Sequence, residues 1–249
     1  MAIIIKSREE REKLREAGHI VADILAKLRS AVRPGITTAD LDAIAAAELR
    51  QRGAKASFLG YHGYPASICT SVNDEIVHGI PGKRVLKDGD IISIDFGAIY
   101  NGWHGDSAIT VPVGEVSSEV KRLLKVTEDS LYRGIAAARA GNRVQDIGRA
   151  VQSFVEEAGF SVVRQYGGHG VGRSMHEDPQ VLNYIEPGYP NPLLRPGMVI
   201  AIEPMVTLGE KETQVLLDKW TVVTVDGSYA AHFEHTVAIT GGDADILTR

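Results

Sequence analysis

The strongest constraint on the fold is an internal duplication. Residues 31–53 align without a gap with residues 137–159, an offset of 106 residues, and both copies share alanine, arginine, glycine and aspartate positions. Each copy has a glycine turn, apolar residues at helical spacing and a second glycine, which predicts an amphipathic helix. A longer helix is expected before each, the first from a capping box of Ser7 and Glu10 and the second over about 119–139.

The duplication continues into the strands that follow these helices. Residues 86–95 (LKDGDIISID) match residues 194–203 (LRPGMVIAIE), and each segment ends on an acid. The next strands, DSAITV and EHTVAI, both open on an acid before an apolar, β-prone run. Two pairs of equivalent acids result: Asp95 with Glu203, and Asp106 with Glu234. Corresponding acids in duplicated units indicate a working site between the two halves.

These patterns predict an α+β fold. Helices followed by strands within each half favour antiparallel neighbours. We expect one catalytic domain over residues 1–249, made of pseudo-repeats of approximately 7–115 and 116–240. The single cysteine, Cys69, excludes an internal disulfide and suits a reducing compartment. The start, MAIIIKSREEREKL, has too short an apolar run for a signal peptide, so a cytoplasmic protein is expected.

Four converging carboxylates would need a counter-charge. Two unit charges about 4 Å apart interact by roughly 4 kcal/mol at an effective dielectric constant of 20, so a bare cluster would take up protons or open. Any one of these acids alone fits a strand end that faces solvent, but the duplication favours convergence. Lysine and arginine are not interleaved with the acids in the flanking strands, which leaves an external cation as the simplest neutraliser. Oxygen ligands with a histidine suit paired divalent first-row metal ions.

The segment GGHGVGRSMHEDP, residues 167–179, offers that histidine twice, as His169 and His176. Its glycines do not form a dinucleotide-binding fingerprint, its His-Glu pair lacks the second histidine of a zincin helix, and it is no nucleophile elbow. Alone, it is equally consistent with a flexible surface loop. The net charge of −5 also argues against nucleic acid as the main ligand.

The chain contains five motifs in a fixed order: VNDEIVHGIP (72–81), IDFGAIYNGWHGDSAIT (94–110), YGGHGVGRSMHEDPQV (166–181), IAIEPMV (200–206) and HFEHTVAI (232–239). They resemble the motifs of type I methionine aminopeptidases of the short bacterial form. The similarity covers nearly the whole chain, and the order of the motifs makes it specific. It implies the pita-bread fold, two pseudo-symmetric halves around a dinuclear metal site, which agrees with the duplication.

The resemblance implies a role for each matching polar residue. Its five metal ligands are Asp95 on one ion, Asp106 and Glu234 bridging both ions, and His169 and Glu203 on the other. The set accepts Mn²⁺, Fe²⁺, Co²⁺ or Zn²⁺, so the identity of the two ions stays open. A bridging water that ionises near neutral pH would attack the peptide bond, with Glu203 as general base. His78 and His176 would hydrogen-bond the scissile amide and stabilise charge on its oxygen.

The resemblance also implies an apolar slot for a methionine side chain. The matching residues are Phe58, Tyr61, Tyr64, Cys69, Met175 and Trp220. Core packing is the alternative for each, although the run FLGYHGYPASIC is too glycine-rich to lie wholly inside a strand. Cys69 is expected to line the slot rather than to act as a nucleophile. His62 is expected beside the slot, and the other histidines at the surface or in satisfied hydrogen bonds: His19, His104, His232 and His235.

Two positions depart from the family pattern. Gly167 stands where many bacterial relatives carry a cysteine, and Met175 stands where an aromatic residue is common. Neither is a ligand, so we expect them to alter the contours of the pocket and not the reaction.

The expected activity is removal of the initiator methionine from nascent polypeptides with a small second residue. The ribosome near its exit tunnel is a candidate partner, no membrane or specific nucleic acid is expected, and the enzyme is expected to be a monomer. Two alternatives stay open. One is an Xaa-Pro aminopeptidase, although such relatives usually carry a separate amino-terminal domain for which 249 residues leave no room. The other is a pita-bread module without metals that serves as a ribosome or histone adaptor.

Overall fold

A computed structural model describes residues 2–249. Its helices are α1 (Arg8–Ala31), α2 (Thr38–Gln51), the 3-10 helix η1 (Tyr61–Gly63), α3 (Ser118–Ala137) and α4 (Val144–Glu157). Its strands are β1 (Lys55–Ala56), β2 (Cys69–Val72), β3 (Glu75–Val77), β4 (Ile91–Tyr100), β5 (Trp103–Pro112), β6 (Ser161–Val162), β7 (Gly168–Gly170), β8 (Glu177–Val181), β9 (Val199–Ile202), β10 (Met205–Thr207), β11 (Thr213–Val215), β12 (Val222–Thr224), β13 (Ala230–His232), β14 (Glu234–Ala238) and β15 (Asp245–Ile246).

The helices repeat as the duplication predicts. α4 begins and ends 106 residues after α2, the offset between the two aligned sequence segments. The predicted capping box of α1 is present, since the Ser7 side chain accepts from the Glu10 backbone and the Glu10 side chain accepts from the Ser7 backbone. The apolar face predicted for α1 is buried, and α3 lies within two residues of the predicted helix at each end.

The main sheet joins the two halves edge to edge. Its nine strands follow the order β1-β4-β5-β14-β9-β7-β8, with β2 beside β4 and β15 beside β14, and its strand pairs are antiparallel. From the seam between β5 and β14, each half repeats the same arrangement outward: β4 and then β2 on one side, β9 and then β7 on the other. The α+β, pseudo-symmetric architecture is therefore confirmed, whereas the repeat boundaries at 115 and 116 stay a prediction.

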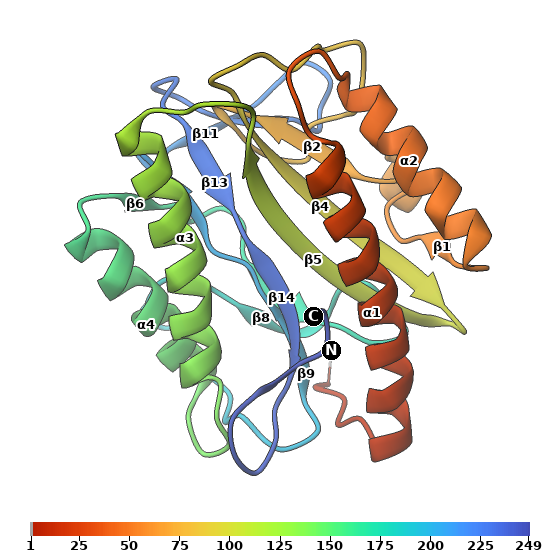
Figure 1. Ribbon diagram of the computed structural model, residues 1–249. Coiled ribbons are helices and arrows are strands. Elements are labelled where there is room, and N and C mark those ends of the chain that lie inside the picture. Colours follow the sequence, from red (N-terminus) through yellow and green to blue (C-terminus); the bar gives the residue numbers. More distant parts are fainter. Residues whose placement is uncertain (1) are drawn as a thin grey trace.

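Strand alternation separates two faces of this sheet. Ile92, Ile94 and Phe96 of β4 are fully buried in a cluster with apolar residues of α1 and α2. Ile200 and Ile202 of β9 pack in the corresponding cluster with α3 and α4. The helix pairs thus lie over the two halves of the sheet (Figure 1). Because neighbouring side chains on a strand point to opposite faces, the residues between and after these positions face away from the helices.

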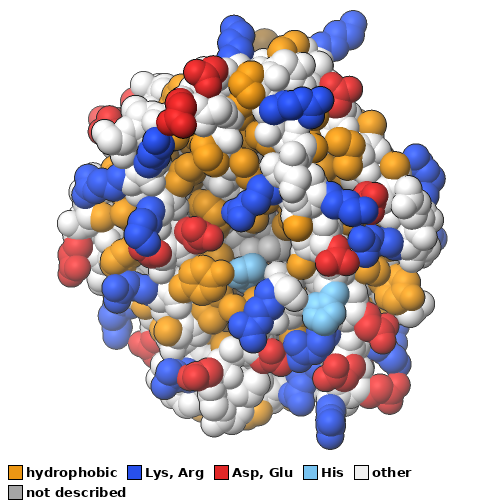
Figure 2. All heavy atoms as spheres, viewed as in Figure 1, with side chains coloured by type: hydrophobic (Ala, Val, Ile, Leu, Met, Phe, Trp, Pro, Cys, Tyr) orange, Lys and Arg blue, Asp and Glu red, His pale blue; other side chains and the backbone are white. Residues whose placement is uncertain are grey.

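Two smaller sheets complete the fold, with the strand orders β13-β10-β6 and β11-β12-β3. On the face shown in Figure 2, basic and acidic side chains are interspersed over the surface. Within residues 2–249, every helix is too short or too polar to cross a lipid bilayer.

Candidate metal centre

Backbone register aligns three of the predicted ligands on one face of the main sheet. Asp95 of β4 pairs with Ala108 of β5, and Ala108 pairs in turn with Glu234 of β14. Paired residues share a face, as do residues two apart on a strand, so Asp106 lies on this face too. Ala108 contributes only a methyl group, which leaves the space above it to the carboxylates. A slip of one residue would turn these acids toward the helices.

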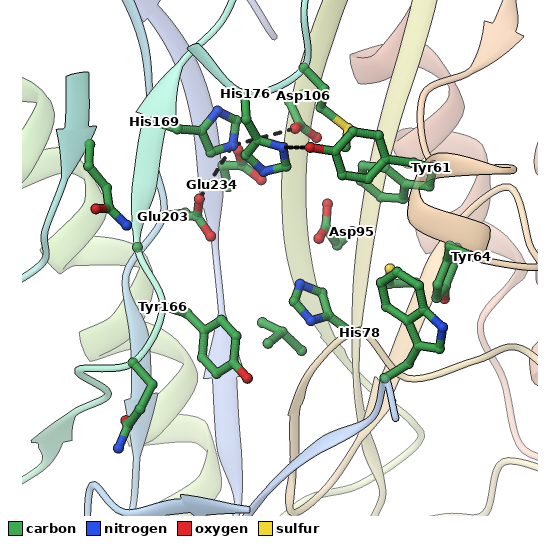
Figure 3. A pocket seen from close by; sticks show the side chains of 18 residues that line it. Tyr61, Tyr64, His78, Asp95, Asp106, Tyr166, His169, His176, Glu203 and Glu234 are labelled. Carbon is green, nitrogen blue, oxygen red and sulfur yellow. Dashed lines mark hydrogen bonds and ion pairs between the residues drawn. The ribbon is translucent and has the colours of Figure 1, made fainter. Parts of the chain in front are cut away.

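The second half supplies the remaining two ligands. β9 ends directly before Glu203 and pairs with β14, which begins at Glu234. β7 carries His169, whose Nε2 lies 3.7 Å from Glu203 Oε1 and 3.9 Å from Asp106 Oδ2 (Figure 3). The other ring nitrogen, Nδ1, lies 2.9 Å from the carbonyl oxygen of Gly170. Because only a protonated Nδ1 can donate to that carbonyl, Nε2 presents its lone pair to the carboxylates, as a metal ligand requires.

The glycines beside His169 are needed for close packing of the backbone. A Cβ on Gly168 would lie 2.2 Å from the carbonyl oxygen of Ala201, and a Cβ on Gly170 would lie 2.4 Å from that of Asp178. Neither glycine has a positive φ. These two glycines therefore serve close strand packing and not loop flexibility.

The donor atoms fit a divalent cation. Asp106 and Glu234 are only 3% and 2% exposed. One oxygen each of Asp95, Asp106 and Glu234 is buried and lacks a hydrogen-bond partner among the described residues. Such buried oxygens are costly unless something coordinates them. Ligand atoms of Asp106, His169 and Glu234 all lie within 4.8 Å of one another. Asp95 and Glu203 face the same cavity but are not part of this tight group of three.

Burial and mutual repulsion disfavour the charged forms of three carboxyls. Burial, together with the charges of Asp106 and Glu203, raises the pKa of Asp95 well above its ordinary value. The same causes, again with burial first, raise the pKa of Glu234. Burial also raises the pKa of Asp106 to about 7, although His169 opposes the shift. A bound cation would reverse these penalties.

Glu203 differs from the other acids because imidazoles surround it. Burial raises its pKa, but His232, His169 and His176 outweigh that effect and leave the pKa of Glu203 below its ordinary value. Its side chain is 13% exposed, so it still reaches the cavity. Glu203 is therefore the acid in this group that most readily stays ionised and able to accept a proton.

Two more histidines face the cavity from opposite sides (Figure 3). Nδ1 of His176 lies 2.8 Å from the hydroxyl of Tyr61. The packing of its ring against the cavity wall, followed by the effect of His169, lowers the pKa of His176 to about 4, although the residue as a whole remains exposed. His78 has a φ of 61°, an unusual conformation for a non-glycine residue, and burial lowers its pKa. Both rings are therefore neutral at pH 7.

The residues predicted for the apolar slot form one cluster. Phe58, Tyr64, Cys69 and Met175 are buried together, and Tyr61 and Trp220 pack against them. All of them line the cavity of about 280 Å³ that also contains the five predicted ligands, His78 and His176. Burial, with the charge of Asp95, raises the pKa of the Cys69 thiol, which disfavours a thiolate nucleophile.

The cavity has further lining residues that were given no catalytic, metal-binding or slot role from the sequence: Val77, Gln165, Tyr166, Gly167 and Gln180. Tyr166 directly precedes the histidine-bearing segment, and its ring packs edge-on against His78 with 5.4 Å between centroids. Its place beside the motif was the available signal. Gly167, noted as a departure from the family pattern, lies in the wall next to it.

The other histidines lie partly where expected. His62 packs against Tyr61 beside the slot. His19 is exposed, His104 is hydrogen-bonded to Ser57, and His235 to Thr248. The expectation for His232 is wrong. It is 1% exposed, and neither ring nitrogen has a hydrogen-bond partner among the described residues.

Comparisons with known proteins agree with this geometry. Residues 12–241 match metallopeptidase family M24. Methionine aminopeptidase 1 of Bacillus subtilis is 57% identical over 249 residues, with 99% of each chain covered. The crystal structure of methionine aminopeptidase from Thermotoga maritima has a TM-score of 0.97 at 46% identity over 100% of both chains. An Xaa-Pro dipeptidase from Bacillus anthracis shares the fold at a TM-score of 0.79 and 23% identity, and 62% of its chain is covered.

Proposed function

The chain belongs to metallopeptidase family M24, and from this membership we propose that it is a metal-dependent aminopeptidase that removes an N-terminal methionine before a small second residue. Relatives 57% and 53% identical over nearly the full length are methionine aminopeptidases. One observation carries the proposal. A single cavity contains both the apolar slot, which can hold a methionine side chain, and the cluster of carboxylates with the imidazole of His169.

The proposed ligands of two divalent ions are Asp95, Asp106, His169, Glu203 and Glu234. Bound divalent cations supply Lewis-acid polarisation of the scissile carbonyl and lower the pKa of a water toward about 7. Glu203 accepts a proton from the attacking water and delivers it to the leaving amine, a role that its depressed pKa and partial exposure support.

His176 and His78 hold the scissile amide. The hydroxyl of Tyr61 lies 2.8 Å from Nδ1 of His176. We assign Tyr61 as the donor, which places the proton of the neutral ring on Nε2, where it can be donated to the carbonyl oxygen of the substrate. His78 approaches from the opposite side of the cavity, with its ring packed edge-on against Tyr166 and Trp220. Donors arranged before the reaction stabilise the developing oxyanion without reorganisation.

The shape of the cavity supports the selectivity. The slot ends on Phe58, Tyr64 and Cys69, which bury an unbranched apolar side chain well. Tyr166 lines the cavity across from Tyr64 (Figure 3), on the side where we place the second residue of the substrate. A bulky second residue would clash there.

Peptide hydrolysis tests the proposal. With Mn²⁺ or Co²⁺ added, the protein is expected to cleave Met-Ala-Ser and to leave Met-Leu-Ser and Ala-Pro-containing peptides largely intact, and Glu203→Ala is expected to abolish cleavage. If Met-Ala-Ser survives with both metals, the proposal is wrong. Preferential cleavage of Xaa-Pro peptides would favour an Xaa-Pro aminopeptidase instead.

Several finer features belong to the same proposal. The native ions are two of Mn²⁺, Fe²⁺, Co²⁺ or Zn²⁺, which elemental analysis of gently purified protein will identify. The enzyme acts as a cytoplasmic monomer on nascent chains near the ribosomal exit tunnel. Sedimentation with and without ribosomes tests both the oligomeric state and that contact.

A further inference from the structure

A buried histidine lies directly behind Glu203. His232 is the last residue of β13, in the sheet β13-β10-β6. Two hydrogen bonds to Thr110 of β5 fix its backbone. The His232 N–H donates to Thr110 Oγ1 at 2.8 Å, and that hydroxyl donates to the His232 carbonyl at 2.7 Å. The residue is 1% exposed. With the main chain held at both groups, only side-chain rotation remains to place the imidazole.

The imidazole of His232 lies beside the carboxylate of Glu203. Its Nε2 lies 3.6 Å from Oε2 of Glu203, and neither ring nitrogen has a hydrogen-bond partner among residues 2–249. A buried imidazole without partners is costly, because its N–H has lost its hydration. The separation of 3.6 Å is slightly longer than a hydrogen bond, and hydrogen bonds in empty catalytic sites are often long and shorten when the site is loaded.

The two oxygens of Glu203 have different partners. Oε1 lies 3.7 Å from Nε2 of His169, in the cavity, whereas Oε2 faces His232 behind it. The main chain of Glu203 is held as well, because Asn183 Nδ2 donates to its carbonyl at 2.9 Å. Asn183 is fully buried. The rotation of the carboxylate is therefore the remaining degree of freedom, and His232 is the group placed to fix it.

We propose that His232 is a positioning residue, which donates its Nε2–H to Oε2 of Glu203 and so directs Oε1 into the cavity. This inference rests on the proposed function, because it gives Glu203 its role there. A group that orients a metal-binding or proton-accepting carboxylate typically changes metal affinity or activity by about 10- to 100-fold when it is removed.

Two amide substitutions separate this role from plain packing. In His232→Gln the amide nitrogen takes the place of Nε2 and still reaches Glu203. In His232→Asn the amide nitrogen takes the place of Nδ1, one bond short of the carboxylate. Both variants bury the same amide group and differ by one methylene, whose packing effect is measured separately by thermal unfolding in EDTA. His232→Leu, which has no donor, is the third variant.

Three measurements are made on the full chain: kcat and KM for Met-Ala-Ser, Mn²⁺ affinity by calorimetry, and thermal unfolding in EDTA. We expect kcat of His232→Gln within about threefold of wild type, and kcat of His232→Asn and His232→Leu lower by about 10- to 100-fold, with weaker Mn²⁺ binding. KM should change little, because the slot is untouched.

Equal kcat and Mn²⁺ affinity in the Gln and Asn variants, or wild-type values in His232→Leu, would overturn the inference. If one variant fails to fold in EDTA, the comparison of the remaining two with wild type decides by the same criteria. Failure of the wild type itself to cleave Met-Ala-Ser would instead count against the proposed function, and the Mn²⁺ affinities would still report on His232.

Discussion

The hydroxyl of Tyr61 and Nδ1 of His176 meet across the cavity at 2.8 Å. Tyr61 belongs to η1 in the first half of the chain, and His176 precedes β8 in the second half. With Tyr61 as the donor, as proposed above, this contact places the imidazole proton of His176 on Nε2.

Tyr61→Phe is expected to lower kcat for Met-Ala-Ser by about 10-fold, because His176 loses the donor that selects its tautomer. Metal content should not change. Tyr132→Phe is the matched control, since its hydroxyl lies 3.5 Å from His235 outside the cavity and the residue is 46% exposed. Equal kcat in both variants would contradict the role given to Tyr61.

Asp106→Asn is expected to abolish both Mn²⁺ uptake and cleavage, because a ligand shared by two ions serves both. In EDTA at pH 7.5 the same change should raise the free energy of unfolding by about 1–2 kcal/mol, since it removes one of several repelling buried carboxylates. Calorimetry and chemical denaturation measure the two effects. Asp129→Asn is the control, because Asp129 is a partly exposed acid outside the cavity that pairs with Lys125. An active Asp106→Asn would exclude the site proposed here.

The stability of the metal-free protein should depend on pH through Asp106. Its pKa is raised from 3.8 to about 7, so between these values the folded state holds a proton that the unfolded chain has released. Stability from this group is therefore present at low pH and is lost as pH rises toward about 7. His176, with its pKa lowered to about 4, contributes with the opposite sign.

In the comparison with Asp106→Asn the contribution of His176 cancels, which leaves the titration of Asp106 together with its effect on the pKa of Asp95 and of Glu234. When the pH rises from about 5 to about 7.5 in EDTA, the melting temperature of wild type should fall relative to that of Asp106→Asn. Added Mn²⁺ should raise the melting temperature of wild type but not that of the variant. Metal binding should also release protons, which calorimetry in buffers of different ionisation enthalpy detects. A pH-independent difference between the two proteins would refute the assignment.

Gly168→Ala is expected to destabilise the protein by about 1–3 kcal/mol, because the new Cβ would press on the Ala201 carbonyl and force β7 away from β9. Displacement of His169 should weaken Mn²⁺ binding in the same variant. Gly241→Ala meets no atom within 4 Å and serves as the control. If Gly168→Ala matches it in melting temperature and Mn²⁺ affinity, close strand packing is not what requires the glycine.

Local patterns in the sequence were sufficient for the helices α1, α2, α3 and α4 and for the strands β4, β5, β9 and β14 that carry or precede the acids. The helices α2 and α4 follow from apolar spacing and glycine stops, and the offset between them is a property of the amino-acid sequence alone. The thirteen site residues implied by the family resemblance all line one cavity. Periodicity and motif order are properties of neighbouring residues, so they need no knowledge of how distant segments meet.

Only the tertiary structure decided which atoms face one another. The row Asp95, Ala108 and Glu234 depends on register between strands of different halves, and His232 lies behind Glu203 because Thr110 holds its backbone across 122 residues of sequence. Strand alternation says that a residue faces one side or the other, but not which partner it meets there. Pairing between distant strands settles that, and no local pattern of residues records it.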